Sequence, residues 1–369
     1  MQKIKGRFTS ATVFSDTAES YAIAQVQMIC DNEAAAGSKI RIMPDVHPGK
    51  VAPIGLSMTV GSKVMPSFVG SDIGCGITYI RIKNTKIEYQ RLDKVIREYI
   101  PTGAGIRREP HLYSRDFDFS NLLCRKHINE KKAELSLGTL GGGNHFIELC
   151  KDKDENIYAS VHTGSRSLGK EVTDFYVKKG HKLLKEKGIV VPYELTYLEG
   201  KLMEEYLHDV SEVQGYAMLN REIILRELAK HTKWKVEKYG ESIHNYVDEN
   251  RVLRKGAVSA YKEDEVIIPV NMKDGIIIAE GKGNPLWNYS APHRGGRIMS
   301  REEVRKTHTV SEFKRQVQGI YSTTVNAETL DEAPFAYRGI DEIVEAIKDT
   351  VEVKKILKPI YNYKAGERR

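Results

Sequence analysis

The sequence predicts a mixed α+β fold in which strands carry glycine-rich functional loops. Two patterns lead to this prediction: short apolar, β-prone runs recur along the chain, and stretches with apolar residues at helical spacing lie between and after them. The 369 residues, 40% of them hydrophobic, are enough to build a substantial core. We therefore expect a single large mixed domain over residues 1–369.

The elements follow from apolar periodicity and from the residues that end it. A helix is predicted over Ser15–Ala36, ending at Gly37, followed by a short strand over Lys39–Met43. Further strands are predicted at Gly55–Val60, Ile77–Ile82, Phe146–Cys150, Ile157–Val161, Val266–Val270 and Ile276–Ala279.

Two helical regions complete the expected fold. The polar segment at roughly 170–235 has helical periodicity and is predicted to form a helical insertion or subdomain set on the strand-rich part. Near the end of the chain, Ser300-Arg-Glu-Glu303 has the form of a capping box, which predicts that a helix begins there.

Composition excludes several classes of protein. No stretch approaches the roughly 18 to 20 consecutive apolar residues that span a bilayer, and the start MQKIKGRFTS has no apolar signal-peptide core. We expect a cytoplasmic protein without a membrane partner. The 4 cysteines show no CxxC spacing, which argues against a disulfide framework or a zinc ribbon.

The formal charge of +7 is modest for this length, but lysines crowd one segment beside His181. They are Lys170, Lys178, Lys179, Lys182, Lys185 and Lys187. Such a segment would attract a phosphate backbone in a salt-dependent way. A solvated helix face explains the same pattern, so charge alone leaves both interpretations open.

Asp72 and Cys75 lie three residues apart in the glycine-rich turn Val69–Gly76, where both side chains could reach one metal ion. A lone buried cysteine is usually structural. A carboxylate beside it in a turn of this kind is poorly explained by packing, so we interpret the pair as candidate ligands.

Histidines at the ends of β-prone runs are the second group of candidates. The glycine run Leu137–Gly143 leads into Asn144, His145 and Glu148, while His162 and His244 lie at or near the end of other apolar runs. One such histidine is more often a satisfied core residue, but several together favour a metal site, because imidazole is the commonest transition-metal ligand. The glycine run lacks the lysine and hydroxyl of a Walker loop.

His293 is the candidate nucleophile, in a loop rich in glycine and arginine just ahead of the predicted capped helix. Arginine side chains and exposed backbone N–H groups there would neutralise a phosphate. Arg166, Arg294 and Arg297 are the candidates for this role. A structural turn is the competing interpretation of the segment.

In this order, these segments resemble the RtcB family of RNA ligases along almost the whole chain. The matching blocks are Met43–His47, Asp72–Gly76, Gly138–Glu148, His162–Arg166, His244–Tyr246, Arg254–Ala257, Ser290–Arg297, Asp331–Pro334 and Tyr363-Lys364. Two departures stand out. Pro269-Val-Asn-Met272 replaces the family's PGSM, and Arg294 follows His293 where glycine is usual.

The resemblance implies an RtcB-like fold and a GTP- and manganese-dependent ligase. Such an enzyme joins RNA 3′-phosphate or 2′,3′-cyclic phosphate ends to 5′-hydroxyl ends through a guanylyl-histidine, in RNA repair or tRNA splicing. Carried over by position, Asp72, Cys75 and His145 would bind one manganese ion. Cys75, His162 and His244 would bind the second, and an archease-type activating partner is a family-level expectation.

The same comparison places the guanylate on His293 and assigns the GTP contacts. These are Asn144, His145, Phe146, Ile147, Glu148, His244, Asn245, Pro269, Val270, Asn271, Met272, Ile276, His293, Arg294, Gly295, Gly296 and Lys364. The resemblance alone specifies manganese, because a cysteine with three imidazoles suits zinc or cobalt equally well. To attack phosphorus, His293 also needs a carboxylate or carbonyl partner on its other ring nitrogen, which the sequence does not name.

Alternative functions keep part of this chemistry. A nucleotidyl-lysine ligase would need a K-x-D-G motif, and Lys273-Asp-Gly275 lacks the intervening residue. A metal-dependent cyclic phosphodiesterase, or an RNA 3′-end nucleotidyltransferase without ligation, would use the same metals. A basic RNA-binding protein with a structural metal is a third reading, which the many glycines at the site argue against.

Overall fold

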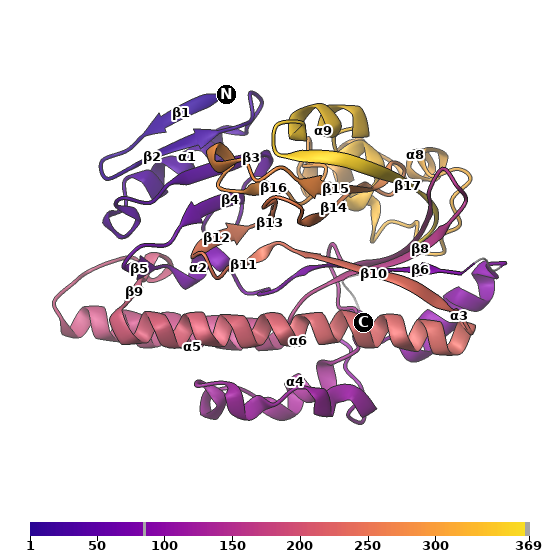
Figure 1. The fold of residues 1–369 in the computed structure, drawn as a ribbon, viewed down its shortest axis with the longest axis horizontal. Helices are drawn as coiled ribbons and strands as arrows, with labels where there is room; N and C mark the ends of the chain where they lie inside the picture. The colour runs from indigo at the N-terminus through magenta and orange to yellow at the C-terminus, as the bar shows by residue number, and fades with distance from the viewer. Residues whose placement is uncertain (84–85, 366–369) are drawn as a thin grey trace.

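Two sheets and a pair of long helices make up most of the computed structural model, which describes residues 1–83 and 86–365 (Figure 1). The predicted mixed α+β fold is confirmed. Strands occupy every apolar run for which the sequence predicts one, with ends that shift by up to four residues.

The first sheet holds the N-terminal strands. Its spatial order is β1 (Gln2–Lys5), β2 (Ser10–Val13), β3 (Ile40–His47), β4 (Ile54–Thr59), β12 (Val252–Lys255) and β11 (Asn245–Val247). β2 and β3 are parallel, and the other neighbours are antiparallel.

The second sheet is antiparallel and curled. Its spatial order is β10 (Val236–Ile243), β6 (Gly76–Ile82), β8 (Ile157–Thr163), β7 (Phe146–Lys151), β17 (Val351–Lys364), β15 (Gly275–Gly281) and β14 (Glu265–Asn271). The edge strands β10 and β14 approach each other, and Lys238 Nζ lies 2.9 Å from a carboxylate oxygen of Glu265. Ile77, Ile267 and Leu357 pack together with other buried side chains of these strands.

Two short strand pairs join the larger elements. One pairs β13 (Ala257–Ser259) with β16 (Ser290–Pro292), and the other pairs β5 (Lys63–Val64) with β9 (Leu198–Glu199). The β13–β16 pair lies directly before His293 in the chain.

The α-helices differ widely in length. They are α1 (Ser20–Cys30), α2 (Pro66–Val69), α3 (Tyr89–Tyr99), α4 (Glu130–Ser136), α5 (Arg166–Glu186), α6 (Gly200–Thr232), α7 (Arg301–Thr307), α8 (Val310–Gln316) and α9 (Ile340–Ile347). α7 begins with the predicted capping box, in which Ser300 and Glu303 exchange side-chain and backbone contacts. Among the described residues, no helix combines the length and apolar character that a membrane span requires.

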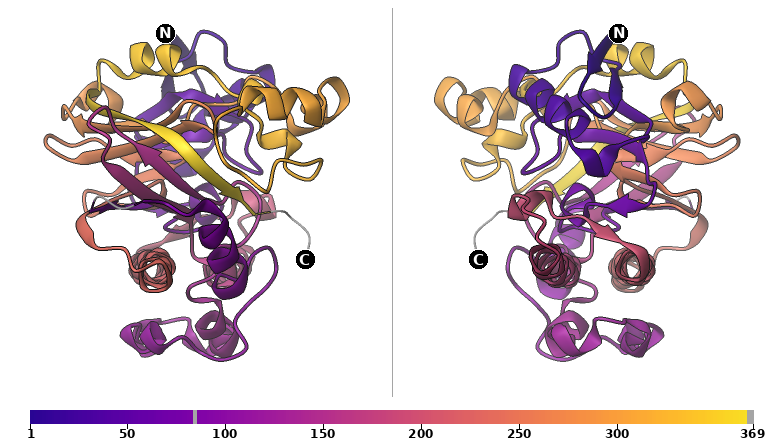
Figure 2. Two further views of the ribbon diagram at one scale, coloured as in Figure 1. Left: turned by 90° about the vertical axis from the view of Figure 1, so that its right-hand side faces the viewer. Right: turned by 90° about the vertical axis from the view of Figure 1, so that its left-hand side faces the viewer.

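α5 and α6 run side by side along one side of the molecule, and α4 lies beyond them (Figure 1; seen end-on in Figure 2). α5 buries Leu168, Val172 and Tyr176, which recur at a spacing of four residues and so share one helix face. The 33-residue α6 packs on β6 and β8 and thereby covers the curled sheet. That this segment forms a subdomain of its own stays a prediction.

Two N-terminal elements differ from the sequence-based expectation. The first helix covers only Ser20–Cys30, and a separate turn begins where the side chain of Asn32 accepts from Ala34 N. The following strand runs on to His47, with a register irregularity against β4 between Ile42 and His47. This bulge lets Asp45 leave the regular alternation of the strand, as bulges commonly re-aim side chains.

Arg221 on α6 ties the helix to two of the segments that carry metal-ligand candidates, the turn before β6 and the end of β8. Its Nη1 donates to Gly74 O at 2.7 Å and to Thr163 O at 2.9 Å, while Nη2 bonds Glu241 at 2.6 Å. The side chain is fully buried. A buried guanidinium with all its partners in place fixes the distance between these two loops.

We expect Arg221→Met to lower the free energy of unfolding by roughly 3 kcal/mol, because it leaves Glu241 and two carbonyls without their partner. Denaturant unfolding measures this change. The matched control is Arg226→Met on the same helix, whose half-exposed pair with Glu222 should contribute under about 1 kcal/mol. Equal effects of the two substitutions would contradict the role assigned to Arg221.

Candidate metal and nucleophile site

The turn before β6 brings Asp72 and Cys75 together. Gly74 has a φ of +69°, and a Cβ on it would lie 2.9 Å from the backbone of Gln214 in α6. Gly164 is equally constrained, because its Cβ would lie 2.1 Å from Asp72 Oδ1. Glycine at these two positions therefore allows α6 and the Asp72 carboxylate to come this close.

The side chains of Asp72, His145, His162 and His244 gather around the thiol of Cys75. These five residues come from four separate segments of the chain. The Sγ of Cys75 lies 3.3 Å from His162 Nε2 and 3.7 Å from His145 Nε2. His162 Nε2 is 3.3 Å from His244 Nε2, and His145 Nε2 is 3.2 Å from Asp72 Oδ2. Within each of two triads, Asp72–Cys75–His145 and Cys75–His162–His244, the donor atoms lie within 4.8 Å of one another.

Backbone carbonyls orient two of these imidazoles. His145 Nδ1 lies 2.8 Å from Leu140 O, and His162 Nδ1 lies 3.2 Å from Asn144 O. Because a carbonyl only accepts, each Nδ1 carries the hydrogen and each Nε2 lone pair faces the cluster. A second ring contact of this kind is what fixes metal-ligating histidines in proteins.

The electrostatics of the cluster suit a bound cation. Burial lowers the pKa of His162 and His244 well below the usual value, so both rings are neutral donors. Burial and the nearby Asp72 raise the pKa of the Cys75 thiol well above its usual value. A divalent ion at the thiol would reverse this effect and stabilise the thiolate, so the donor set of one thiol, one carboxylate and three imidazoles fits metal binding.

His293 stands beside the cluster with its tautomer fixed. Its Nδ1 lies 2.8 Å from Asp45 Oδ2, and both side chains are buried. The hydrogen on Nδ1 leaves Nε2 as the ring atom with a lone pair. The ring centroid of His293 is 4.7 Å from that of His244, so the candidate nucleophile adjoins the metal-ligand cluster.

His293 opens onto a cleft of about 450 Å³. Its lining includes His47, Asn144, Arg294, Gly296, Arg297 and Arg301. All three arginines pair with the buried Glu332, and Glu19 also lines the cleft. Because three guanidinium groups share that one buried carboxylate, cations outnumber anions there, which suits phosphate groups.

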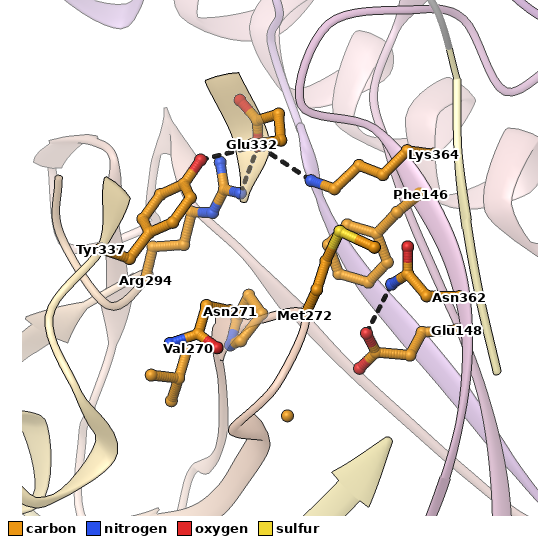
Figure 3. Close-up of a pocket in the computed structure, with 12 residues that line it drawn as sticks. Phe146, Glu148, Val270, Asn271, Met272, Arg294, Glu332, Tyr337, Asn362 and Lys364 are labelled. Carbon is orange, nitrogen blue, oxygen red and sulfur yellow. Dashed lines mark hydrogen bonds and ion pairs between the residues drawn. The ribbon is translucent and has the colours of Figure 1, made fainter. Parts of the chain in front are cut away.

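A second, narrower pocket lies next to the cleft (Figure 3). Its lining includes Phe146, Glu148, Pro269, Val270, Asn271, Met272, Glu332, Asn362 and Lys364. Arg294 and Tyr337 line both spaces, so they mark the border between the pocket and the cleft.

Glu332 is the centre of a buried ion-pair network at this border. Its carboxylate lies 2.9 Å from Arg294 Nη2 and 2.8 Å from Lys364 Nζ, and it accepts from Tyr337 OH at 2.7 Å (Figure 3). Burial opposes the charge, but the Lys364 and arginine cations hold the pKa of Glu332 well below its usual range. Glu332 therefore orients two side chains that the resemblance assigns to GTP.

Glu148 is held differently, on the floor of the same pocket. Its Oε1 accepts from Cys150 Sγ at 3.1 Å and its Oε2 from Asn362 Nδ2 at 2.6 Å. Burial raises the pKa of Glu148 to about 7, although both hydrogen bonds lower it. This carboxylate therefore changes its protonation state near neutral pH.

Six residues predicted to contact GTP line neither space, and two of them, His145 and His244, belong to the metal-ligand cluster. Ile147 packs in the core on the opposite face of β7 from Phe146 and Glu148, and Ile276 packs inside the curled sheet. Asn245 bonds Asp72 O and Gly256 N, and Gly295 N bonds Pro269 O. Asn245 therefore supports the turn that holds Asp72 and Cys75, and Gly295 supports the segment 269–272.

Two further predicted roles fit the structure poorly. Arg166 bonds Thr139 Oγ1 at 3.1 Å and Gly103 O at 2.8 Å, so it braces the glycine-rich loop. In the lysine-rich helix, acidic neighbours of α5 and its surroundings pair with Lys170, Lys179, Lys182 and Lys187. Local neutralisation of this kind favours the solvated-face interpretation.

Sequence reasoning assigned no role to Asp45, Glu332, Tyr337 or Asn362. Asp45 and Glu332 lie inside the motif blocks Met43–His47 and Asp331–Pro334, so an acidic residue within a matching block was the available signal. Nothing in the sequence pairs Asp45 with His293, 248 positions away.

The fold and site define a protein with a cluster of candidate metal ligands and a carboxylate-oriented histidine beside an arginine-lined cleft. The family model described as tRNA-splicing ligase RtcB matches residues 25–125 and 120–365. The chain belongs to the RtcB family.

Named relatives support this placement. RNA-splicing ligase RtcB1 of Escherichia coli strain ATCC 25922 is 31% identical over 364 residues, covering 87% of this chain and 88% of the relative. RNA-splicing ligase RtcB of strain K12 is 30% identical, with the same coverage. tRNA-splicing ligase RtcB of Pyrobaculum aerophilum is 24% identical over 86% of this chain and 85% of the relative.

The position of Glu148 predicts a pH-dependent stability change. Its pKa rises from 4.5 in the unfolded chain to about 7 in the folded protein, so folding loses stability as the pH rises through this window. We expect Glu148→Gln to stabilise the ligand-free protein by on the order of 3 kcal/mol at pH 8 and by under about 1 kcal/mol at pH 5.

Urea unfolding at the two pH values measures the difference, with the exposed Glu249→Gln as a control that should change little at either pH. If Glu148→Gln is no more stable than the unmodified protein at pH 8, burial does not destabilise the ionised Glu148 carboxylate.

Proposed function

We propose that this protein is an RNA ligase that forms a guanylyl-histidine on His293. The observation that carries the proposal is the contact of His293 Nδ1 with Asp45 at 2.8 Å, beside the Cys75-centred cluster. The names of the relatives, all RNA-splicing or tRNA-splicing ligases, support the same reaction class.

In the proposed first step, His293 Nε2 attacks the α-phosphorus of GTP, and the bond to pyrophosphate breaks. Asp45 accepts the Nδ1 hydrogen throughout, which fixes the tautomer that presents Nε2 to the phosphorus and stabilises the positive charge that develops on the ring. The guanidinium of Arg294, next to the nucleophile, is placed to neutralise phosphate charge.

In the proposed second and third steps, GMP passes from His293 to the 3′-phosphate of one RNA end. The 5′-hydroxyl of the other end then attacks that phosphorus and GMP leaves, which makes the phosphodiester bond. This activation is needed because a phosphate monoester has no good leaving group. The positive lining of the cleft suits the two RNA ends, and a 2′,3′-cyclic end would first be hydrolysed.

Asp72, Cys75, His145, His162 and His244 would hold the two manganese ions of the proposal. When bound, such ions supply charge stabilisation at phosphoryl oxygens and activation of an oxygen nucleophile. The guanine base would enter the pocket of Figure 3, between Phe146 and Met272 with Glu148 and Lys364 at its polar ends. Because the free volume of the ligand-free pocket is only about 10 Å³, lining side chains would have to move apart to admit the base. An archease-type activator remains an expectation from the family alone.

Incubation with manganese and GTP radiolabelled at the α-phosphate tests the nucleophile. The protein should acquire an acid-labile, base-stable label, which His293→Ala abolishes. Asp45→Asn should slow labelling by roughly 10² to 10⁴-fold, because an amide that donates to Nδ1 forces the hydrogen onto Nε2.

A matched control is Glu227→Gln, which alters a carboxylate–histidine contact on α6 outside the cleft and should label normally. A label that survives in His293→Ala would contradict the proposed nucleophile. RNA pairs with a 3′-phosphate or 2′,3′-cyclic phosphate end and a 5′-hydroxyl end then separate ligation from the alternatives in the presence of GTP. Hydrolysis of the cyclic end without joining would indicate a phosphodiesterase, and transfer of GMP without joining a nucleotidyltransferase.

A further inference from the structure

Two buried polar atoms in the pocket of Figure 3 have no hydrogen-bond partner among the described residues. They are Asn362 Oδ1 and Arg294 Nε. Both residues line the pocket, and their side chains are buried, with residue exposures of 1% and 8%. A buried polar atom without a partner costs roughly 1 to 3 kcal/mol, so native proteins rarely leave one unpaired. Because both residues line the pocket, a polar ligand bound there would supply these partners.

The orientation of the Asn362 amide is fixed by its neighbour. Asn362 on β17 is the register partner of Glu148 on β7, and its Nδ2 donates to Glu148 Oε2 at 2.6 Å. Because an ionised carboxylate only accepts, the amide nitrogen faces Glu148 and the oxygen faces the other way (Figure 3). Asn362 therefore offers the ligand an acceptor.

Glu148 is a second acceptor beside it. Cys150 Sγ on the other side and Asn362 Nδ2 hold the carboxylate in place, and each of its oxygens keeps a further acceptor site. The pocket thus presents two adjacent acceptors, with the apolar side chains of Phe146 and Met272 nearby for the faces of a flat ring.

We propose that Asn362 is a base-specificity residue, whose Oδ1 accepts a hydrogen bond from the 2-amino group of guanine. Glu148 accepts from N1–H. The inference rests on the proposed function, because it assumes a guanine nucleotide at this site.

Among the common purines, this pattern matches guanine alone. Guanine carries N1–H and a 2-amino group side by side, which are the donors that two adjacent acceptors need. Adenine presents an acceptor at N1, and hypoxanthine has N1–H without the amino group. A site whose polar groups lose their partner discriminates strongly, because the unpaired group stays buried.

Calorimetric binding of GTP and of inosine triphosphate, which lacks only the 2-amino group, tests the proposal. The experiment uses the full chain with manganese and His293→Ala, so that binding is not followed by labelling. We expect GTP to bind about tenfold more tightly than inosine triphosphate, corresponding to one buried hydrogen bond. Asn362→Leu should weaken GTP binding and bring the two nucleotides to nearly equal affinity.

Cys150→Ala is the matched control. Cys150 also contacts Glu148 but does not line the pocket, so its removal should keep the preference for GTP. Loss of the preference in Cys150→Ala as well would mean that Asn362 acts only by positioning Glu148, and would overturn the direct contact.

If Asn362→Leu does not fold, the proposal is still tested by comparing GTP and inosine triphosphate in the protein that keeps Asn362. Equal binding of GTP and inosine triphosphate there would overturn the inference on Asn362 while leaving the ligase proposal intact. Failure to bind either nucleotide would overturn both.

Discussion

Cys75 Sγ lies within 3.7 Å of two imidazoles, and the surrounding structure is arranged to make this crowding possible. A buried thiol next to a carboxylate is a poor anion by itself, because burial and Asp72 both raise its pKa. Cations on either side would reverse that cost. The glycines at 74 and 164, the guanidinium of Arg221 and the carbonyls of Leu140 and Asn144 all maintain the positions of the donors.

Polar partners also hold the candidate nucleophile and the residues of the proposed nucleotide pocket in place. Asp45 orients His293 as the carbonyls orient the metal-ligand candidates, and Glu332 orients Arg294 and Lys364. His145, His162, His293, Arg294 and Lys364 are thus each held by a second polar group. In the proposed reaction this preorganisation replaces the solvent reorganisation that phosphoryl transfer would need in water.

Local patterns in the sequence predicted much of this arrangement, because strand ends, glycine turns and capping boxes are local signals. Asp72 with Cys75 in one turn and His162 at the end of β8 are examples. The convergence of these residues came only from resemblance to a family. The partner of His293 was out of reach, since the bulge in β3 that redirects Asp45 depends on pairing with β4 and on Gly55, whose φ is +96°. The proposed role of Asn362 could not be predicted from the sequence, because it depends on Glu148 on the neighbouring strand β7.

The central claim is that two ions share the Cys75 thiolate next to His293. Anomalous X-ray diffraction at the manganese absorption edge, from crystals grown with manganese, locates bound ions directly. The account predicts two peaks flanking Cys75 Sγ, one in bonding contact with Asp72 and His145 and the other with His162 and His244. A single peak, or peaks that do not contact Cys75, would contradict it.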